Sequence, residues 1–131
     1  MPQPLAGLKI ADFSHVMAGP FCSHFLRMLG AEVIKVEAFG GDPLRNYGPF
    51  RDMDGMAPAF VAANVGKKSI AIDLKKPAGA EVAQRLVRSC DVVLENFRPG
   101  VMARLGLGFS DRKSTRLNSS HPSISRMPSS A

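Results

Sequence analysis

The sequence predicts an α/β fold built around a parallel β-sheet. Four short runs rich in Ile and Val alternate with segments whose apolar residues recur at helical spacing. Gly and Pro residues mark most of the changes from one kind of segment to the other. Strands that alternate with helices in this way are typical of a parallel sheet whose connections cross over through helices.

The expected strands are short, and polar residues stand at their ends. Their centres are almost entirely apolar, as in parallel strands that are covered on both faces. The four strands are expected at residues 9–13, 32–36, 69–73 and 91–95.

Two crossover helices are well signalled. Between the first two strands, apolar residues recur at helical spacing over 21–29, Pro20 suits the first helical position, and Gly30 suits the residue after the end. A second helix starts at Pro77 and runs to about residue 88, with its apolar residues on one face.

Residues 38–59 are read as a long connecting loop, and a short helix is expected from about Ala59 to Asn64. Loops of that length are usually functional or disordered. Four strands make only part of a doubly wound sheet, so residues 1–110 are interpreted as the amino-terminal part of one larger domain.

Residues 111–131 differ from the rest of the chain. In one reading frame, the blocks 111–121 and 125–131 resemble the translation of a common sequencing-library adapter. We therefore expect this tail to be disordered and exclude it from functional reasoning. The tail holds four basic residues and one acidic residue, so the net charge of +6 for the whole chain falls to +3 over residues 1–110.

A mild positive charge suits a small polyanion and is too scattered to indicate nucleic-acid binding. The start of the chain lacks a charged segment followed by an apolar one, and no apolar run is long enough to span a membrane, so we expect a cytoplasmic protein with no membrane partner. Cys22 and Cys90 lie far apart in apolar patterns, which favours reduced core thiols over a disulfide or a metal site.

Two turns point to an anionic ligand. His15–Pro20 follows the first strand and places small residues and bare backbone at the start of a helix, where anions bind. Glu95–Gly100 follows the fourth strand. Because ligands of open α/β sheets bind outside the carboxyl ends of the strands, the two turns predict one site for a phosphate-rich cofactor.

The same residues resemble a known family. The matching segments, which cover the first 110 residues in order, are Pro4–Ile10, His15–Pro20, Leu29–Glu37, Gly41–Pro43, Asn64–Ile70, Ile72–Lys75, Glu95–Gly100 and Leu105–Gly108. They resemble the amino-terminal part of family III coenzyme A (CoA) transferases, the CaiB/BaiF type. The resemblance implies a Rossmann-like large domain, incomplete here, and a full-length protein that forms an interlaced homodimer.

The resemblance also implies an activity in acyl-CoA metabolism. Such enzymes move CoA from an acyl-CoA thioester to a carboxylic acid through an enzyme aspartyl intermediate. In the family, that aspartate lies beyond residue 110, so we assign no catalytic residue here and expect this chain alone to be inactive. The implied cofactor is CoA or acyl-CoA, bound as substrate, without a metal.

The resemblance transfers CoA-binding positions onto matching residues of this chain. They are His15, Val16, Met17, Ala18, Ile72, Lys75, Asn96, Phe97, Arg98 and Arg104. Position 38 departs from the family, because Ala38 stands where some members carry a basic residue that contacts the nucleotide.

Each of these residues also has a plain structural interpretation. His15 could be a turn or cap residue, Lys75 a solvated lysine after a strand, and Phe97 a core residue.

Other charged residues are interpreted as structural. Asp12 is expected to be a buried acid bonded to turn amides. Lys67 and Lys68 are expected to form a solvated entry to the third strand. Asp42 is expected to pair with Arg45 within the loop, although the resemblance implies an acid and a base here near the active-site cleft.

Two other functions remain open. One is a fragment of the related α-methylacyl-CoA racemase, although the stretch Tyr47–Ala63 favours a transferase. The other is a dinucleotide-binding domain, in which Glu37 would hold a ribose. That domain needs a G-x-G-x-x-G turn, and only Gly19 is present here.

Overall fold

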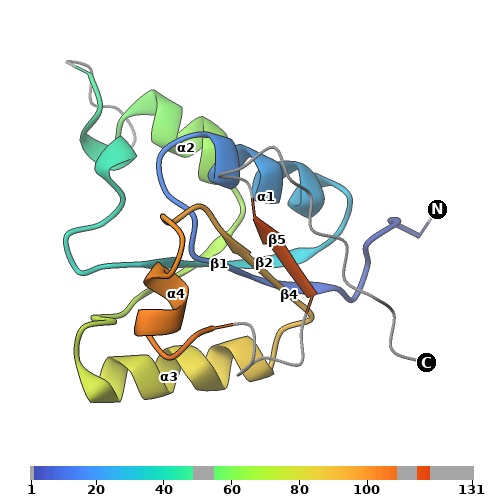
Figure 1. Cartoon of the computed structure of the whole chain (residues 1–131). Helices are drawn as coiled ribbons and strands as arrows, with labels where there is room; N and C mark the ends of the chain where they lie inside the picture. The colour runs from blue at the N-terminus through green and yellow to red at the C-terminus, as the bar shows by residue number, and fades with distance from the viewer. Residues whose placement is uncertain (1, 49–54, 109–114, 119–131) are drawn as a thin grey trace.

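A computed structural model describes residues 2–48, 55–108 and 115–118. All strands of its single sheet are parallel, in the order β3-β2-β1-β4-β5 (Figure 1). The strands are β1 (Lys9–Asp12), β2 (Glu32–Glu37), β3 (Lys68–Ala71), β4 (Val92–Glu95) and β5 (Thr115–Asn118). The predicted α/β class with a parallel sheet is therefore confirmed.

The chain reverses direction across the sheet at β1. From β1 it moves outward to β2 and β3, and it then returns to place β4 on the other side of β1. Ile10 of β1 is aligned with Val33 of β2 and with Val92 of β4. The carboxyl ends of β1 and β4 thus form the switch point at which ligands bind in folds of this kind.

Helices cover both faces of the sheet. The helices α1 (Ala18–Met28) and α2 (Pro58–Asn64) lie on one side, and α3 (Pro77–Arg88) and α4 (Val101–Arg104) lie on the other (Figure 1). The sequence predicts α1, α2 and α3. It misplaces the start of α1, however, because Pro20 occupies the third helical position. Proline is tolerated there because the first N–H groups of a helix have no intrahelical partner.

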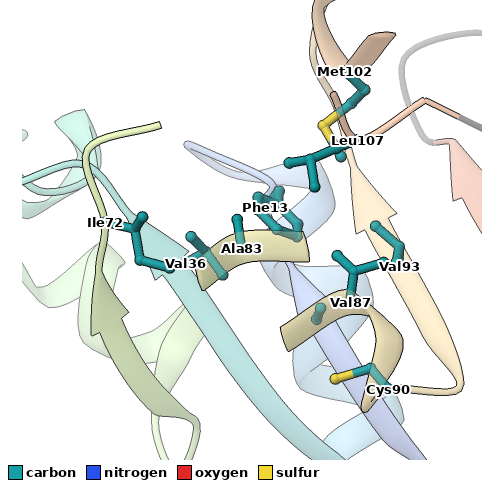
Figure 2. Packing of buried hydrophobic residues seen from close by; sticks show 10 residues of the cluster. Phe13, Val36, Ile72, Ala83, Val87, Cys90, Val93, Met102 and Leu107 are labelled. Atoms are coloured by element: carbon teal, nitrogen blue, oxygen red, sulfur yellow. The ribbon is translucent and has the colours of Figure 1, made fainter. Parts of the chain in front are cut away.

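The larger hydrophobic cluster lies between the sheet and helices α3 and α4 (Figure 2). It joins Phe13, which follows β1, to Ala83 and Val87 of α3 and to Met102 of α4. A second cluster lies under α1 around Ile10 and Val33. Cys90 belongs to the first cluster and Cys22 packs against the second, so the two free thiols lie on opposite faces of the sheet.

Two details differ from the sequence-based expectation. The third strand, predicted to be buried, is largely exposed, because β3 forms the edge of the sheet. The expected loop contains a 3₁₀ helix, η1 (Pro43–Asn46), which the side chain of Asp42 caps by accepting a hydrogen bond from the Leu44 amide at 2.9 Å. Residues 49–54 of that loop lie outside the described residues.

The sequence also predicts no regular structure in the tail, yet Thr115–Asn118 forms β5 and pairs in parallel with Val92–Glu95 of β4. A physical reason lies in β4, which without β5 would expose a row of backbone N–H and C=O groups. An extended segment of almost any sequence can bond to such a row. The other residues of the tail, 111–114 and 119–131, lie outside the described part of the chain.

Candidate functional site

The structure brings the two predicted turns together at the switch point. The Asn96 side chain accepts a hydrogen bond from the His15 amide at 2.9 Å and donates one to the His15 carbonyl at 2.8 Å. Next to this bridge, the rings of His15 and Phe97 meet edge to face, with centroids 5.1 Å apart. The turn after β1 and the turn after β4 therefore form one continuous surface, as the sequence predicts.

Val16 shapes the first turn with an unusual backbone. Its φ of +66° makes it the one non-glycine residue with positive φ in the described ranges. A β-branched residue in the left-handed region is a true outlier, and such strain persists only where surrounding contacts enforce it. Here both carboxylate oxygens of Asp42 lie 3.2 Å from the Val16 nitrogen and accept its N–H.

The start of α1 offers backbone donors to a ligand. Met17 stands at the N-cap position, and its side chain makes no cap hydrogen bond. Gly19 allows α1 to approach the strand closely, because a Cβ atom there would lie 2.2 Å from Cβ of Ser14. Uncapped N–H groups at a helix start carry partial positive charge and favour an anion.

The remaining predicted residues lie around this surface in different ways. Ile72 is buried in the larger hydrophobic cluster. Its side chain therefore has a packing role. Lys75, Arg98 and Arg104 are exposed, and within the described ranges their charged groups form no ion pair. Phe97 combines both of its interpretations, since it packs against the larger cluster and contacts His15.

A buried ion pair anchors the strand and helix on either side of the first turn. Asp12 accepts hydrogen bonds from the Ser14 amide at 3.0 Å and from the hydroxyls of Ser14 and Ser23. The expectation for Asp12 is thus confirmed. The expectation for Lys67 is wrong, because its ammonium is buried and binds Asp12 at 3.1 Å and the Pro20 carbonyl at 2.8 Å. Burial lowers the pKa of Lys67, while Asp12 acts in the opposite direction.

A second buried ion pair involves the loop. Asp42 binds the Lys35 ammonium at 2.9 Å, and both side chains are almost fully buried. Arg45 instead forms two hydrogen bonds with Glu37, at 2.7 and 2.8 Å. The expected pair between Asp42 and Arg45 is therefore wrong, because Lys35 and Glu37 of β2 are closer partners for the two charges.

Glu37 is fully engaged by this arrangement. Its carboxylate also accepts hydrogen bonds from the Ser69 hydroxyl at 2.9 Å and the Asp42 amide at 3.0 Å. Burial alone would raise the pKa of Glu37, but the hydrogen bonds, chiefly that from Arg45, outweigh burial and hold the pKa at about 2. Because both oxygens are occupied, the geometry argues against Glu37 as the ribose-binding acid of a dinucleotide site.

His15 faces the same cluster. Burial, assisted by the Lys35 ammonium, lowers the pKa of His15 below its usual 6.5, while Asp42 opposes this shift. The ring is therefore neutral at pH 7. Its Nδ1 atom lies 4.0 Å from Asp42 and makes no hydrogen bond with the described residues. A buried ring nitrogen without a partner is a group that a ligand can satisfy.

A shallow depression lies near the edge of the sheet. It has a volume of about 240 Å³ and lies at the carboxyl ends of β2 and β3, with Ala38, Phe39, Gly41 and Ala71 among its lining residues. Pockets for drug-sized ligands usually measure roughly 300–1,000 Å³, so this depression can hold only part of a large ligand.

With this geometry established, comparison with known proteins identifies the family. The family model described as CoA-transferase family III matches residues 5–116. The chain belongs to this family. The matched residues include both turns that form the switch-point surface.

Named relatives of this family III chain agree with the match. A succinyl-CoA:glutarate CoA-transferase of Mus musculus is 44% identical over 110 residues, which cover 83% of this chain and 25% of the relative. A formyl-CoA:oxalate CoA-transferase of Rhodopseudomonas palustris is 45% identical over 120 residues, covering 90% of this chain and 27% of the relative. The chain thus spans about a quarter of the length of these relatives.

Solved structures of the family share the fold. A CAIB/BAIF family protein from Brucella suis superposes with a TM-score of 0.79 and 42% identity, covering 85% of this chain and 30% of its own. A hypothetical protein from Mycobacterium tuberculosis superposes with a TM-score of 0.78 and 41% identity. The match covers 88% of this chain and 34% of the other chain. The chain therefore contains part of the family III fold.

Sequence reasoning did not single out Lys35, and it assigned Asp42 and Lys67 a partner and surroundings that differ from those in the structure. A signal was present for Lys35, because a lysine inside the apolar run Val33–Val36 of a covered strand needs a buried partner. The partners themselves, 7 and 55 residues from Lys35 and Asp12, became identifiable only in three dimensions.

Over residues 2–48, 55–108 and 115–118, no helix is long and apolar enough to cross a membrane.

Proposed function

We propose that the turns at residues 15–18 and 96–98 hold the nucleotide end of an acyl-CoA in a CoA transferase. The observation that carries the proposal is the Asn96 bridge, which joins the two turns into one surface beside the start of α1. Lys75, Arg98 and Arg104 are exposed cations, which suits a ligand with several phosphates. The Phe97 ring, which contacts His15, offers an apolar surface that suits the adenosine portion.

In the proposed reaction, an enzyme aspartate attacks the thioester carbonyl of the donor. The C–S bond breaks, CoA leaves as thiolate, and a mixed anhydride forms. The thiolate then attacks the enzyme-derived carbonyl of the anhydride, which releases the donor acid and leaves CoA as an enzyme thioester. The acceptor carboxylate repeats these steps in reverse and leaves as the new acyl-CoA.

The nucleophile is proposed to lie in the three quarters of the relatives' length that this chain does not span. Within the described residues, the fully buried carboxylates near the turns are already engaged. Asp12 binds Lys67 and two serine hydroxyls, Asp42 binds Lys35, and Glu37 binds Arg45. We therefore expect the 131-residue chain to bind CoA without transferring it, and the full-length homodimer to be the active form.

Calorimetric titration of the 131-residue chain with CoA and, in parallel, with NAD tests the proposal. We expect saturable binding of CoA and no binding of NAD. Preference for NAD, or no CoA binding by a chain shown to be folded, would overturn it.

Acyl exchange between succinyl-CoA and free carboxylates, followed by mass spectrometry, tests the second part. We expect no exchange by this chain. Measurable turnover by the pure chain would contradict the placement of the nucleophile elsewhere in the protein.

A further inference from the structure

The carboxylate of Asp42 lies where the loop after β2 meets the first turn after β1. It accepts the Val16 N–H at 3.2 Å, the Leu44 N–H at 2.9 Å and a hydrogen bond from the Lys35 ammonium at 2.9 Å. Its side chain is fully buried. A carboxylate so placed links the conformation of the loop to that of the turn.

We propose that Asp42 is a positioning residue that fixes the left-handed backbone at Val16. The turn then has its CoA-binding conformation before CoA binds. This inference rests on the proposed function, because it explains how the CoA-binding surface is shaped. Asp42 itself is covered by Val16, Leu44 and Lys35, so it acts through the turn and does not touch the ligand.

The strain at Val16 is the first reason. L-residues pay about 1–2 kcal/mol in the left-handed region, and a β-branched side chain is among the least suited to it. Val16 is about half exposed, so packing of its side chain does little to impose this conformation. Among the described residues, the Val16 N–H group donates hydrogen bonds to the two carboxylate oxygens of Asp42.

The chemistry of the contacts is the second reason. Every hydrogen-bond partner that surrounds the Asp42 carboxylate is a donor: two amides and one ammonium. A carboxylate accepts at both oxygens, whereas the amide of an asparagine would turn one NH₂ group toward these donors. Lys35 also donates to the Ser14 carbonyl at 2.9 Å. The ion pair therefore bonds to the backbone of the turn both before and after His15, through Ser14 and Val16.

The test combines Asp42→Asn with Val16→Gly in the 131-residue chain. Exchange of the Val16 amide hydrogen, measured by NMR without ligand, reports the hydrogen bond, and calorimetry reports CoA affinity. We expect Asp42→Asn to speed exchange at Val16 and to weaken CoA binding about tenfold, the factor that corresponds to the cost of restoring a left-handed residue. Adding Val16→Gly should recover most of the loss, because glycine adopts positive φ readily.

Glu32→Gln is the matched control. Glu32 lies on β2, the strand of Lys35, and its substitution removes an ion pair of similar length, 3.0 Å to Lys68. This pair is exposed and lies at the opposite end of the sheet. We expect the substitution to leave both Val16 exchange and CoA affinity unchanged. Asp42→Asn could unfold the chain by leaving the Lys35 ammonium buried without a partner. In that case the double variant Lys35→Met/Asp42→Asn, which removes both charges together, takes the place of Asp42→Asn in the same measurements.

The proposal is overturned if Val16 exchange stays slow in the folded Asp42 variant. It is also overturned if Val16→Gly changes CoA affinity by the same factor in both backgrounds, because the two residues are then not coupled. If the parent chain binds no CoA, the proposed function fails, while the exchange measurement still decides the role of Asp42.

Discussion

The Asn96 bridge gives the sharpest test of how the candidate site is assembled. Asn96→Ala removes two hydrogen bonds, of 2.9 and 2.8 Å, that hold the His15 backbone. A hydrogen bond of this kind contributes about 0.5–1.5 kcal/mol net, so the variant should lose about 2 kcal/mol of unfolding free energy. Because the bridge also sets the spacing of the two turns, we expect CoA affinity to fall with it.

Urea denaturation followed by circular dichroism measures the first effect, and calorimetry with CoA measures the second. Gln84→Ala is the control, since it removes one amide hydrogen bond, 3.1 Å to the Gly106 carbonyl, on α3. It should cost no more than about 1 kcal/mol and leave CoA affinity unchanged. Equal stability and equal affinity of Asn96→Ala and the parent chain would refute the reasoning.

Three further predictions concern the fold that supports the site. Gly79→Ala should destabilise the chain in urea, although alanine favours helices, because the new Cβ would lie 2.0 Å from the Asp73 carbonyl oxygen; a more stable variant would show that α3 is not this close. The Glu37 carboxyl has a folded pKa of about 2 against an ordinary 4.5, so its contribution to stability is present above pH 4.5 and is lost as pH falls toward 2. Urea titrations over that pH range should show a steeper loss of unfolding free energy for the parent chain than for Glu37→Gln. Parallel curves of unfolding free energy against pH would contradict this. Lys67→Met should lower the unfolding free energy by about 3–5 kcal/mol, because it leaves the buried carboxylate of Asp12 without its cation, and a loss below 1 kcal/mol would show that Asp12 is satisfied without it.

The local pattern of the sequence was enough to predict the strands, the crossover helices and the two turns. Apolar periodicity identifies β1, β2, β4, α1 and α3 because each of these elements must bury one face or both. The same pattern also identifies β3, but it wrongly predicts that this strand is buried, because an edge strand looks apolar in sequence and is exposed in the sheet. Pairing of Thr115–Asn118 with β4 also had no local signal, because backbone groups carry it.

The meeting of the two turns was also predictable, because the carboxyl ends of adjacent parallel strands share one edge of the sheet. What the sequence could not supply is the set of buried charges behind that edge. Lys35 could pair with any nearby acid, and Asp42 with Arg45 or Lys35.

The sequence by itself therefore determined the α/β class, the order of the elements and the meeting of the two turns, because each follows from short-range patterns and strand direction. Only the tertiary structure decided which charge neutralises which, and that Val16 has a left-handed backbone whose N–H is bonded to Asp42. The physical reason is that burial makes an ion pair depend on distances of about 3 Å between elements far apart in the chain, and such distances exist only once the sheet and helices have packed.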